Sequence, residues 1–237
     1  MEPPPVLAAA IQAAVTQARA QGIRQLAARV DACDTALIHA LEGSGFRLVD
    51  TLAIFELRLG QDGILREVSL PEGVAIRLAA AADVPVLMDM ARRTFSDRAL
   101  WRDRFHADPH IPDALADELY AQWVKNSIAP DAPGDSMADV AWVAVVEGRL
   151  AGFLTGRLDR SQGTLVGAVS LNAVDAPYRG RGIYRALVRG SMPWFWQKGC
   201  ALIRVRTSLA SHGVRRTWTQ LGAFPVSNEH TFHWWER

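Results

Sequence analysis

The sequence predicts an α/β (α+β) protein in which segments of strand and helix alternate along most of the chain. Two kinds of observation support this class. Apolar stretches of strand length, such as residues 140–146 and 164–174, alternate with stretches whose apolar residues have helical spacing. Helix starts and stops also punctuate the chain, with Asp34 as a cap and with Gly22 and Gly45 as terminators.

Composition and charge narrow the class of protein. The chain has 237 residues and a net charge of +1. This length suits one large domain or two small ones, and the charge gives no bulk attraction to nucleic acid or to an anionic membrane. The two cysteines have no metal-ligand spacing, so we expect neither a metal site nor a disulfide framework. The lack of a disulfide framework fits a reducing cytoplasm. The start has no basic segment and is a poor signal peptide, and without a run of about 18 apolar residues we expect no transmembrane helix.

Residues 1–59 predict a first α/β unit. Its elements are a helix over 6–21, a strand over 23–30, a helix over 35–44 that Asp34 caps, and one or two strands over 46–59. Residues 60–73 are rich in turn-forming residues and predict a linker.

Residues 74–237 predict a second and larger unit. Asp83 opens its first helix, with Pro85 in the first turn, and a hairpin turns at Glu147 and Gly148. The remaining elements are a strand at 74–78, a loop at 97–113, a helix at 113–128, a strand at 164–174, a helix at 184–199, a strand at 201–209, a helix at 212–222 and a strand at 225–236.

The two ends of the chain resemble each other. Residues 26–58 and 202–235 both run strand, capped helix, small residue, Phe and strand, and a single-residue gap aligns them. Any α/β unit with a glycine-rich exit has this pattern, which is the simpler explanation. The agreement in order and length over more than 30 residues favours a structural duplication.

The segment RGRGIY, residues 179–184, follows a predicted strand and enters a predicted helix. Gly180 and Gly182 carry no Cβ atom, so backbone N–H groups can approach a ligand closely. The first turn of a helix adds unpaired N–H donors and a positive dipole end. Together these features suit a pyrophosphate, with Arg179 and Arg181 at the rim of its site. An ordinary strand-to-helix turn that binds no ligand can have the same sequence pattern.

In this order, the motifs resemble the GNAT (GCN5-related N-acetyltransferase) family. Its central motif is Arg/Gln-x-x-Gly-x-Gly/Ala after a strand, which matches here at Arg179 and Gly182 and departs at Tyr184. Residues 74–87 and 203–224 resemble the family's first and late motifs. The resemblance covers roughly residues 74–237 and implies a central mixed, mostly antiparallel sheet flanked by helices. Residues 1–59 are then a partial GNAT-like unit that precedes the complete domain.

The resemblance implies acetyl-CoA as the co-substrate, without a metal. The strand end Asn172, Ala173 and Val174 would hold the pantetheine through its backbone and polarise the thioester carbonyl, which gives Asn172 a catalytic role. Ser211 replaces an Asn that often contacts the cofactor. The residues expected around the pyrophosphate are Arg179, Gly180, Arg181, Gly182, Ile183, Tyr184 and Arg185.

The usual proton donor of this family is missing. A Tyr in the late helix often protonates the leaving thiolate, whereas this sequence has Trp218 there, and an indole N–H does not give up its proton. His212, at the start of that helix, is a candidate base, and Tyr178 and Tyr184 are candidate acids. Each His of the chain is more commonly a surface or core residue, and protonation by water stays open.

Residues 95–128 resemble a narrower group of enzymes, which N-acetylate nucleotide-linked amino sugars such as a dTDP-amino sugar. These enzymes also begin with a partial GNAT-like unit. Arginines there would meet a diphosphate, and aromatic rings would stack on a base or a sugar. Tyr120 and Trp123 are one helical turn apart, so they also suit a core. The expected substrate-binding residues are Arg98, Arg104, Phe105, His110, Tyr120 and Trp123, with Arg102 as a further cation.

The leading prediction is therefore an acetyl-CoA-dependent N-acetyltransferase that transfers an acetyl group directly to a small-molecule amine, with a nucleotide sugar as the favoured acceptor. Two alternatives remain at this point. The acceptor can be another small amine or a peptide amine. The chain can also be a GNAT-like module that binds CoA without catalysis, which Trp218, Ser211 and Tyr184 favour. A homodimer is a further expectation.

Overall fold

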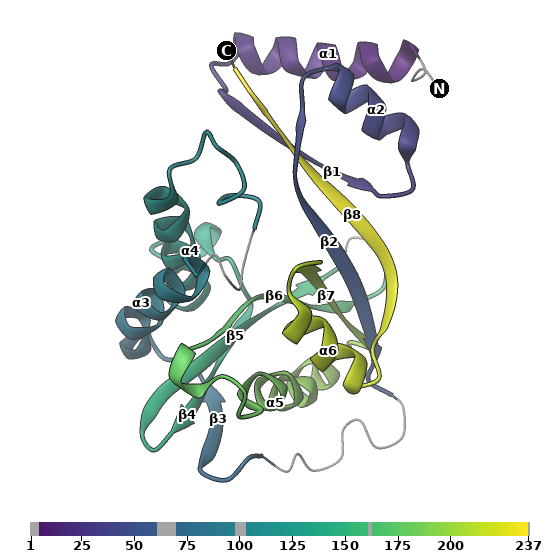
Figure 1. Ribbon diagram of the computed structural model, residues 1–237. Helices are drawn as coiled ribbons and strands as arrows, with labels where there is room; N and C mark the ends of the chain where they lie inside the picture. Colours follow the sequence, from purple (N-terminus) through teal and green to yellow (C-terminus); the bar gives the residue numbers. More distant parts are fainter. Residues whose placement is uncertain (1–4, 61–69, 98–102, 161–162, 237) are drawn as a thin grey trace.

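One mixed sheet of eight strands runs through the whole protein (Figure 1). The computed structural model describes residues 5–60, 70–97, 103–160 and 163–236. The strand order is β1-β8-β2-β7-β6-β5-β4-β3, and every neighbouring pair is antiparallel except β6 and β7. The predicted mixed, mostly antiparallel sheet is therefore confirmed.

The first unit follows the predicted order of elements and contains one long last strand. Its elements are α1 (Pro5–Ala20), β1 (Gln25–Asp31), α2 (Thr35–Gly43) and β2 (Arg47–Arg58). Asp34 caps α2 as expected, since its carboxylate accepts a hydrogen bond from the Leu37 N–H at 3.0 Å. Of the predicted linker, residues 61–69 lie outside the described residues.

The middle of the chain forms one end of the sheet and covers one of its faces. Its strands are β3 (Val74–Leu78), β4 (Val140–Val146), β5 (Arg149–Asp159) and β6 (Val166–Val174). The helices α3 (Val84–Phe95) and α4 (Asp113–Ile128) pack together on the face of β4, β5 and β6. Asp83 precedes α3 and joins Arg77 in a two-pronged ion pair with N–O distances of 2.6 and 2.8 Å.

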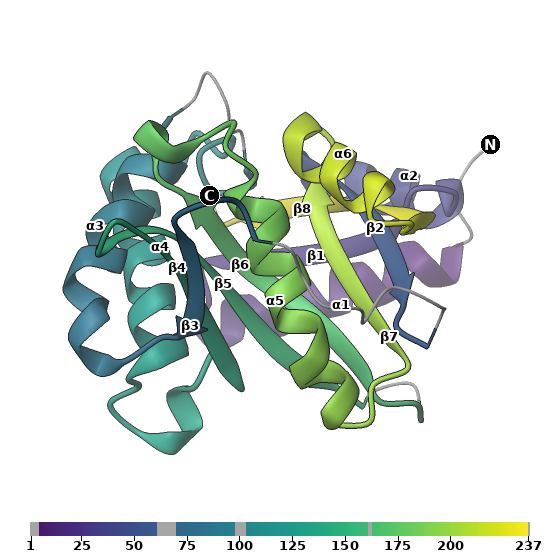
Figure 2. The ribbon, with the colours of Figure 1, turned by 90° about the horizontal axis from the view of Figure 1, so that it is seen from below.

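The last part of the chain covers the opposite face. It contains α5 (Ile183–Gln197), β7 (Leu202–Ser208), α6 (His212–Gln220) and β8 (Phe224–Trp235). Figure 2 shows α5 crossing the sheet on the side away from α3 and α4. None of the described helices is both long enough and apolar enough to cross a membrane.

The two ends of the chain match element by element. Strand β1, helix α2 and strand β2 have 7, 9 and 12 residues, as do β7, α6 and β8, and each begins and ends 177 residues before its counterpart. Gly45 and Gly222, which share this spacing, have φ angles of 88° and 89°. The match needs no gap, so the gapped alignment expected from sequence is wrong: Phe46 corresponds to Ala223 rather than to Phe224.

The pairing register obeys the same relation. Thr51 pairs with His230 and Ala53 with Asn228, so exchanging the two units maps one pair onto the other. The outer pairs agree as well, because Gln25 lies opposite Trp235 and Arg58 lies opposite Leu202. A pseudo-twofold axis therefore passes between β2 and β8, and each unit places its last strand beside the other unit's strands (Figure 1).

The hydrophobic cores share this symmetry. A small core lies between α1, α2 and the sheet, and a larger one lies beneath α5 and α6. Six pairs of buried core residues are 177 positions apart: Val15 and Met192, Ala18 and Phe195, Leu41 and Trp218, Phe46 and Ala223, Phe55 and Phe232, and Leu57 and Trp234. Residues 1–59 thus repeat the packing of the last part of the chain.

Candidate active site

Strands β6 and β7 diverge in the middle of the sheet. Their parallel pairing is limited to Val166–Val169 on β6 and Leu202–Val205 on β7, although both strands continue further. A β-bulge lies at this point, because Thr155 of β5 faces two residues of β6, Ser170 and Leu171. The Thr155 hydroxyl fixes the bulge, since its Oγ1 contacts the Leu171 N–H at 2.9 Å and the Leu171 carbonyl at 3.2 Å.

The divergence frees the backbone at the end of β6. Leu171 and Asp175 direct their N–H groups toward β5, where they bond to Thr155 and to the Ala151 carbonyl. Neighbouring residues of a strand point to opposite sides, so Asn172 and Val174 direct their polar groups into the opening. These are two of the three residues predicted to hold the pantetheine. The third, Ala173, is buried against the core under α3 and α4.

Two buried hydroxyls beside the opening have no hydrogen-bond partner within the described part of the chain. They belong to Thr207, near the end of β7, and to Ser211, which precedes α6. Both residues are at most 5% exposed. Buried polar groups are normally hydrogen-bonded, so these atoms indicate a ligand with polar groups of its own, as the amides of pantetheine are.

The Gly-Arg turn has the backbone geometry of an anion site. Gly180 and Gly182 have φ angles of 77° and 75°, in the region that favours glycine. Helix α5 begins directly after Gly182, and in the described residues the N–H groups of Ile183, Tyr184 and Arg185 bond to no backbone carbonyl. The turn therefore offers both free donors and the positive end of a helix dipole.

The side chains of this turn are partly engaged. The Arg179 guanidinium donates to the Val174 carbonyl at 3.1 Å and to the Asp97 carboxylate at 3.2 Å. Arg181 is exposed and lies 5.8 Å from the centre of the Tyr178 ring. Tyr178 itself packs against the larger core. Arg181 is thus the freer of the two cations, whereas Arg179 ties the turn to the end of β6.

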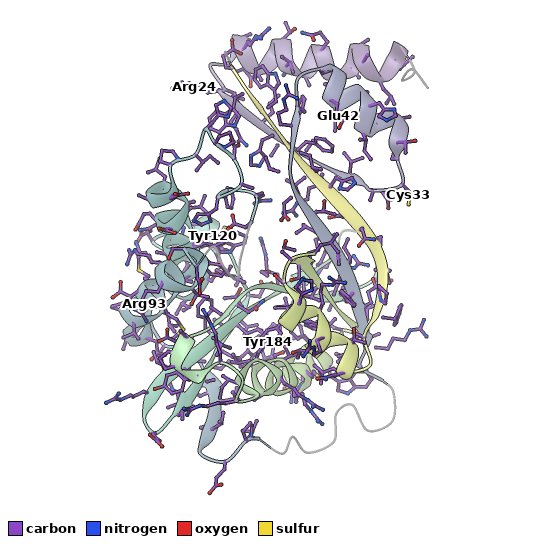
Figure 3. The ribbon with its side chains drawn as sticks, in the orientation of Figure 1. Arg24, Cys33, Glu42, Arg93, Tyr120 and Tyr184 are labelled. Carbon is purple, nitrogen blue, oxygen red and sulfur yellow. The ribbon has the colours of Figure 1, made fainter. Side chains whose placement is uncertain are left out.

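Tyr184 reaches from α5 to α6. The Trp218 indole N–H donates to the Tyr184 hydroxyl at 2.8 Å, and within the described residues the phenol proton has no acceptor. Burial raises the pKa of the Tyr184 phenol above its usual range, although the Trp218 hydrogen bond acts in the opposite direction. A tyrosine hydroxyl therefore lies beside the position where the family's tyrosine is replaced. Figure 3 shows Tyr184 and Tyr120 on opposite sides of the sheet.

A cavity of about 520 Å³ opens on the other side of the divergent strands. Its walls come from β1, β2, β5, β6, β7, α3, α4, α6 and the described part of the α3–α4 loop (residues 96–97 and 103–112), and Asn172 belongs to its lining. The curved strands β2 and β8 arch over this region in Figure 1. We call it the main cavity.

The main cavity brings together four of the six predicted substrate residues. Arg104, Phe105, Tyr120 and Trp123 all line it. Tyr120 also stacks on Phe95 at a centroid distance of 4.1 Å, so it belongs to both core and cavity. Arg98, like Arg102, lies outside the described residues.

His110 and His212 lie elsewhere. His212 is exposed at the start of α6 and is not among the residues that line the main cavity. His110 lines a second cavity of about 350 Å³, where it stacks on Trp235. There the buried Asp108 carboxylate accepts from the His233 ring at 2.6 Å and the Trp235 indole at 2.7 Å. Asp108 thus fastens the α3–α4 loop to β8.

The sequence reasoning missed the charged residues that the first unit contributes. Arg29 of β1 and Asp50 of β2 line the main cavity, as does Asp103 of the α3–α4 loop. Burial, reinforced by the charge of Asp103, raises the pKa of Asp50 to about 6, although hydrogen bonds from Ser208 and Thr51 oppose the rise. In the sequence, Asp50 could have been singled out as the one Asp within the otherwise mostly apolar stretch of residues 48–55.

The acetyltransferase (GNAT) family model matches residues 98–223, more than half of the chain. The chain belongs to this family. It is therefore an N-acetyltransferase, and the family's acetyl donor is acetyl-CoA. The cavity with Asp50 and Arg104 lies beside the divergent strands.

Comparison with individual proteins agrees with this assignment. A dTDP-fucosamine acetyltransferase of Escherichia coli O6:H1 is 25% identical over 210 residues, which cover 87% of this chain and 79% of that protein. A GCN5-related N-acetyltransferase from Sphaerobacter thermophilus has a TM-score of 0.58 at 18% identity, over 92% of this chain and 64% of the other.

A tandem GNAT protein from the clavulanic acid biosynthesis pathway has a TM-score of 0.61 at 12% identity, over 93% of this chain and 66% of the other. The chain thus spans just under two thirds of the length of both solved structures. At these identities, the likeness shows the fold, and the GNAT fold predicted from the sequence is confirmed.

Proposed function

We propose that this protein transfers the acetyl group of acetyl-CoA to the amino group of a nucleotide-linked amino sugar. The observation that carries the proposal is a cavity with charged and aromatic walls that opens beside the divergence of β6 and β7. The thioester and the acceptor amine can therefore meet at the end of β6.

The residues present fit the cofactor. The turn with Gly180 and Gly182 suits the pyrophosphate through its backbone donors. Between the strands, the buried hydroxyls of Thr207 and Ser211 have no partner within the described residues and suit the pantetheine amides. When bound there, acetyl-CoA supplies an activated acetyl group.

The end of β6 serves the chemistry through its backbone. Attack by an amine places negative charge on the thioester oxygen, and an N–H donor aimed at that oxygen stabilises it. Asn172 and Val174 direct their backbone groups into the opening, and the Val174 carbonyl is already held by Arg179. The N–H groups of Asn172 and Val174 are therefore the donors that this strand end offers to the developing charge.

Tyr184 is the best-placed acid for the leaving thiolate. Its raised pKa keeps the phenol protonated at neutral pH, as an acid requires. The Trp218 N–H donates to the phenol oxygen and stabilises the negative charge that remains after the proton leaves. In this proposal, Trp218 supports a tyrosine on α5 instead of being a lost acid on α6.

The acceptor class rests on the walls of the main cavity. Arg29 and Arg104 present guanidinium groups, which suit the two phosphates of a sugar nucleotide. Phe105 and Trp123 offer ring faces for a base or a sugar. The name of the Escherichia coli relative, a dTDP-fucosamine acetyltransferase, supports the same class.

Calorimetry with acetyl-CoA and an assay of CoA release test the proposal. The acceptor panel contains dTDP-4-amino-4,6-dideoxygalactose, an aminoglycoside, an amino acid and a short peptide. We expect stoichiometric binding of acetyl-CoA and a kcat/KM for the nucleotide sugar at least about tenfold above the others, since a missing charged contact costs about 1.5–3 kcal/mol. Binding without turnover of any amine would instead support a non-catalytic module.

Two glycine variants separate the cofactor site from general strain. Gly182→Ala and Gly199→Ala both place a Cβ at a positive φ, 75° and 88°, at opposite ends of α5. Each variant should lose about 1–2 kcal/mol of stability. Only Gly182→Ala should weaken acetyl-CoA binding, and equal weakening by both would contradict the assignment of the turn.

A further inference from the structure

We propose that Asp50, a carboxylate of the N-terminal unit (residues 1–59), binds the ammonium group of the acceptor and removes its proton for acetyl transfer. This inference rests on the proposed function and adds a catalytic base to it. The base comes from the duplicated unit, outside the motifs of residues 74–237.

Asp50 lies against the strand that borders the opening. Its Oδ1 accepts a hydrogen bond from the Ser208 hydroxyl, at the end of β7, at 3.1 Å. The strand pairing is consistent with this contact, because Leu52, two residues after Asp50 on β2, pairs with Ser208. Asn172 of β6 lines the same cavity of about 520 Å³. An amine held by Asp50 therefore shares a cavity with the strand end that receives the thioester carbonyl.

Of the two described carboxylates Asp50 and Asp103, Asp50 is the one left available for a cation. Asp103 also lines the cavity, but its carboxylate binds the His106 ring at 2.6 Å and the Phe105 N–H at 2.8 Å. Asp50 accepts a hydrogen bond from the Ser208 hydroxyl and forms no ion pair with any residue that the structure describes. A ligand ammonium would supply the missing positive charge.

The charged groups around Asp50 suit both ends of the proposed substrate, its phosphates and its amine. The cations suit the phosphates, and the Asp50 carboxylate suits the amine. The charged groups on the surrounding elements are Arg29 of β1, Arg157 and Asp159 of β5, Arg204 and Arg206 of β7, Glu229 of β8, and Asp103 and Arg104 of the α3–α4 loop. Among them, Arg206 and Glu229 form an ion pair.

The protonation state of Asp50 suits a base. With a pKa of about 6, the carboxylate is mostly ionised at pH 7, yet it holds a proton more firmly than an ordinary Asp does. A primary amine is mostly ammonium at this pH, because its pKa is commonly about 8 to 10. Ammonium has no lone pair for attack, so one proton must leave before the C–N bond can form.

The protons and bonds balance as follows. Asp50 takes one proton from the ammonium, and the freed lone pair forms the C–N bond to the carbonyl carbon of acetyl-CoA. The C–S bond then breaks with its electron pair on sulfur. The thiolate is protonated by an acid of the protein or by water, while the new amide nitrogen releases a second proton, which restores that acid. Asp50 returns its proton to solvent.

The test compares Asp50→Asn with wild type on the amine of the panel that wild-type protein acetylates fastest. Asn keeps the size and can still accept from Ser208, but it neither carries charge nor takes a proton. Asp31→Asn is the matched control, because Asp31 belongs to the same unit and does not line the main cavity. Calorimetry with acetyl-CoA checks that each variant retains the fold and the cofactor site.

At pH 7, Asp50→Asn should lower kcat/KM for the amine by about 100-fold or more, a typical contribution of a general base. The deficit should shrink toward about tenfold at pH 9, where more of the amine is already free. Acetyl-CoA binding should change less than about threefold, and Asp31→Asn should match wild type in every assay.

Two results would overturn the inference. One is an Asp50→Asn enzyme within about threefold of wild type at pH 7, and the other is a deficit of equal size at pH 7 and pH 9. Neither result touches the proposed function, which fails separately if wild-type protein acetylates no amine of the panel.

Discussion

Replacement of Asp50 by Asn should stabilise the folded protein at alkaline pH. The pKa of this carboxyl is about 6 in the fold against an ordinary value of 3.8, chiefly because of burial. A raised pKa means that the fold favours the protonated form. The stabilisation is fully present below pH 3.8 and is lost as the pH rises through 6. At pH 8, the native state therefore contains an unfavourable charge that Asn removes.

The size of the effect follows from the pKa difference. A rise of about two units corresponds to about 3 kcal/mol, and we halve this to roughly 1–2 kcal/mol because Asp50 is only half-buried and water screens its charge. The free energy of unfolding of Asp50→Asn should exceed that of wild type by this amount at pH 8. At pH 4.5, the gap should narrow to about 0.5 kcal/mol, since the carboxyl is then mostly protonated in the fold.

Urea denaturation at the two pH values, followed by tryptophan fluorescence, measures this gap. Asp31→Asn, on the exposed part of β1, corrects for the loss of a carboxylate in general. A variant that is less stable than wild type at pH 8, or a gap that does not change with pH, would refute the reasoning. A gain in stability together with a loss of activity is typical of a residue kept for function.

Two further predictions concern the acid and the loop. Tyr184→Phe should lower kcat by about 10- to 100-fold with little change in the KM for acetyl-CoA. Trp218→Phe should lower kcat less, because it removes only the donor to the phenol. Equal kcat values for Tyr184→Phe and wild type would exclude the phenol as the acid. Asp108→Asn should cost about 1.5–3 kcal/mol at pH 7, since it weakens the charged bonds to His233 and Trp235. Burial raises the pKa of Asp108, but hydrogen bonds from the His110 N–H, Trp235 and His233 outweigh it and hold the pKa low. The difference in stability should therefore fade as the pH drops below about 4, and denaturation curves that show no loss at pH 7 would contradict the clamp.

Local patterns predicted the elements and the Gly-Arg turn before α5. The helix over 113–128, the hairpin at Glu147 and the cap at Asp34 follow from spacing and turn chemistry, which act within a few residues. The Gly-Arg turn could be predicted for the same reason, because glycine at a positive φ and a helix start are neighbours in sequence.

The long-range features could not be predicted in this way. No local rule places β8 between β1 and β2, so the sequence did not indicate that Asp50 faces Ser208 across 158 positions. Periodicity marked Tyr120 as either core or cavity, and it serves both, because its ring belongs to the core under α3 and α4 and also lines the main cavity. His110 lies at the second cavity because Asp108 and Trp235 hold it there.

The exchange of last strands between the two units has a consequence for how the chain is made. Strand β1 ends at Asp31, and its sheet neighbour β8 begins only at Phe224. At a synthesis rate of about 5–20 residues per second, the roughly 200 residues between them take about 10–40 s to emerge. During that time, the β1 and β2 edges are open to any free strand. A second newly made chain offers an identical β8, so swapping between two nascent chains competes with folding, and the competition grows with concentration.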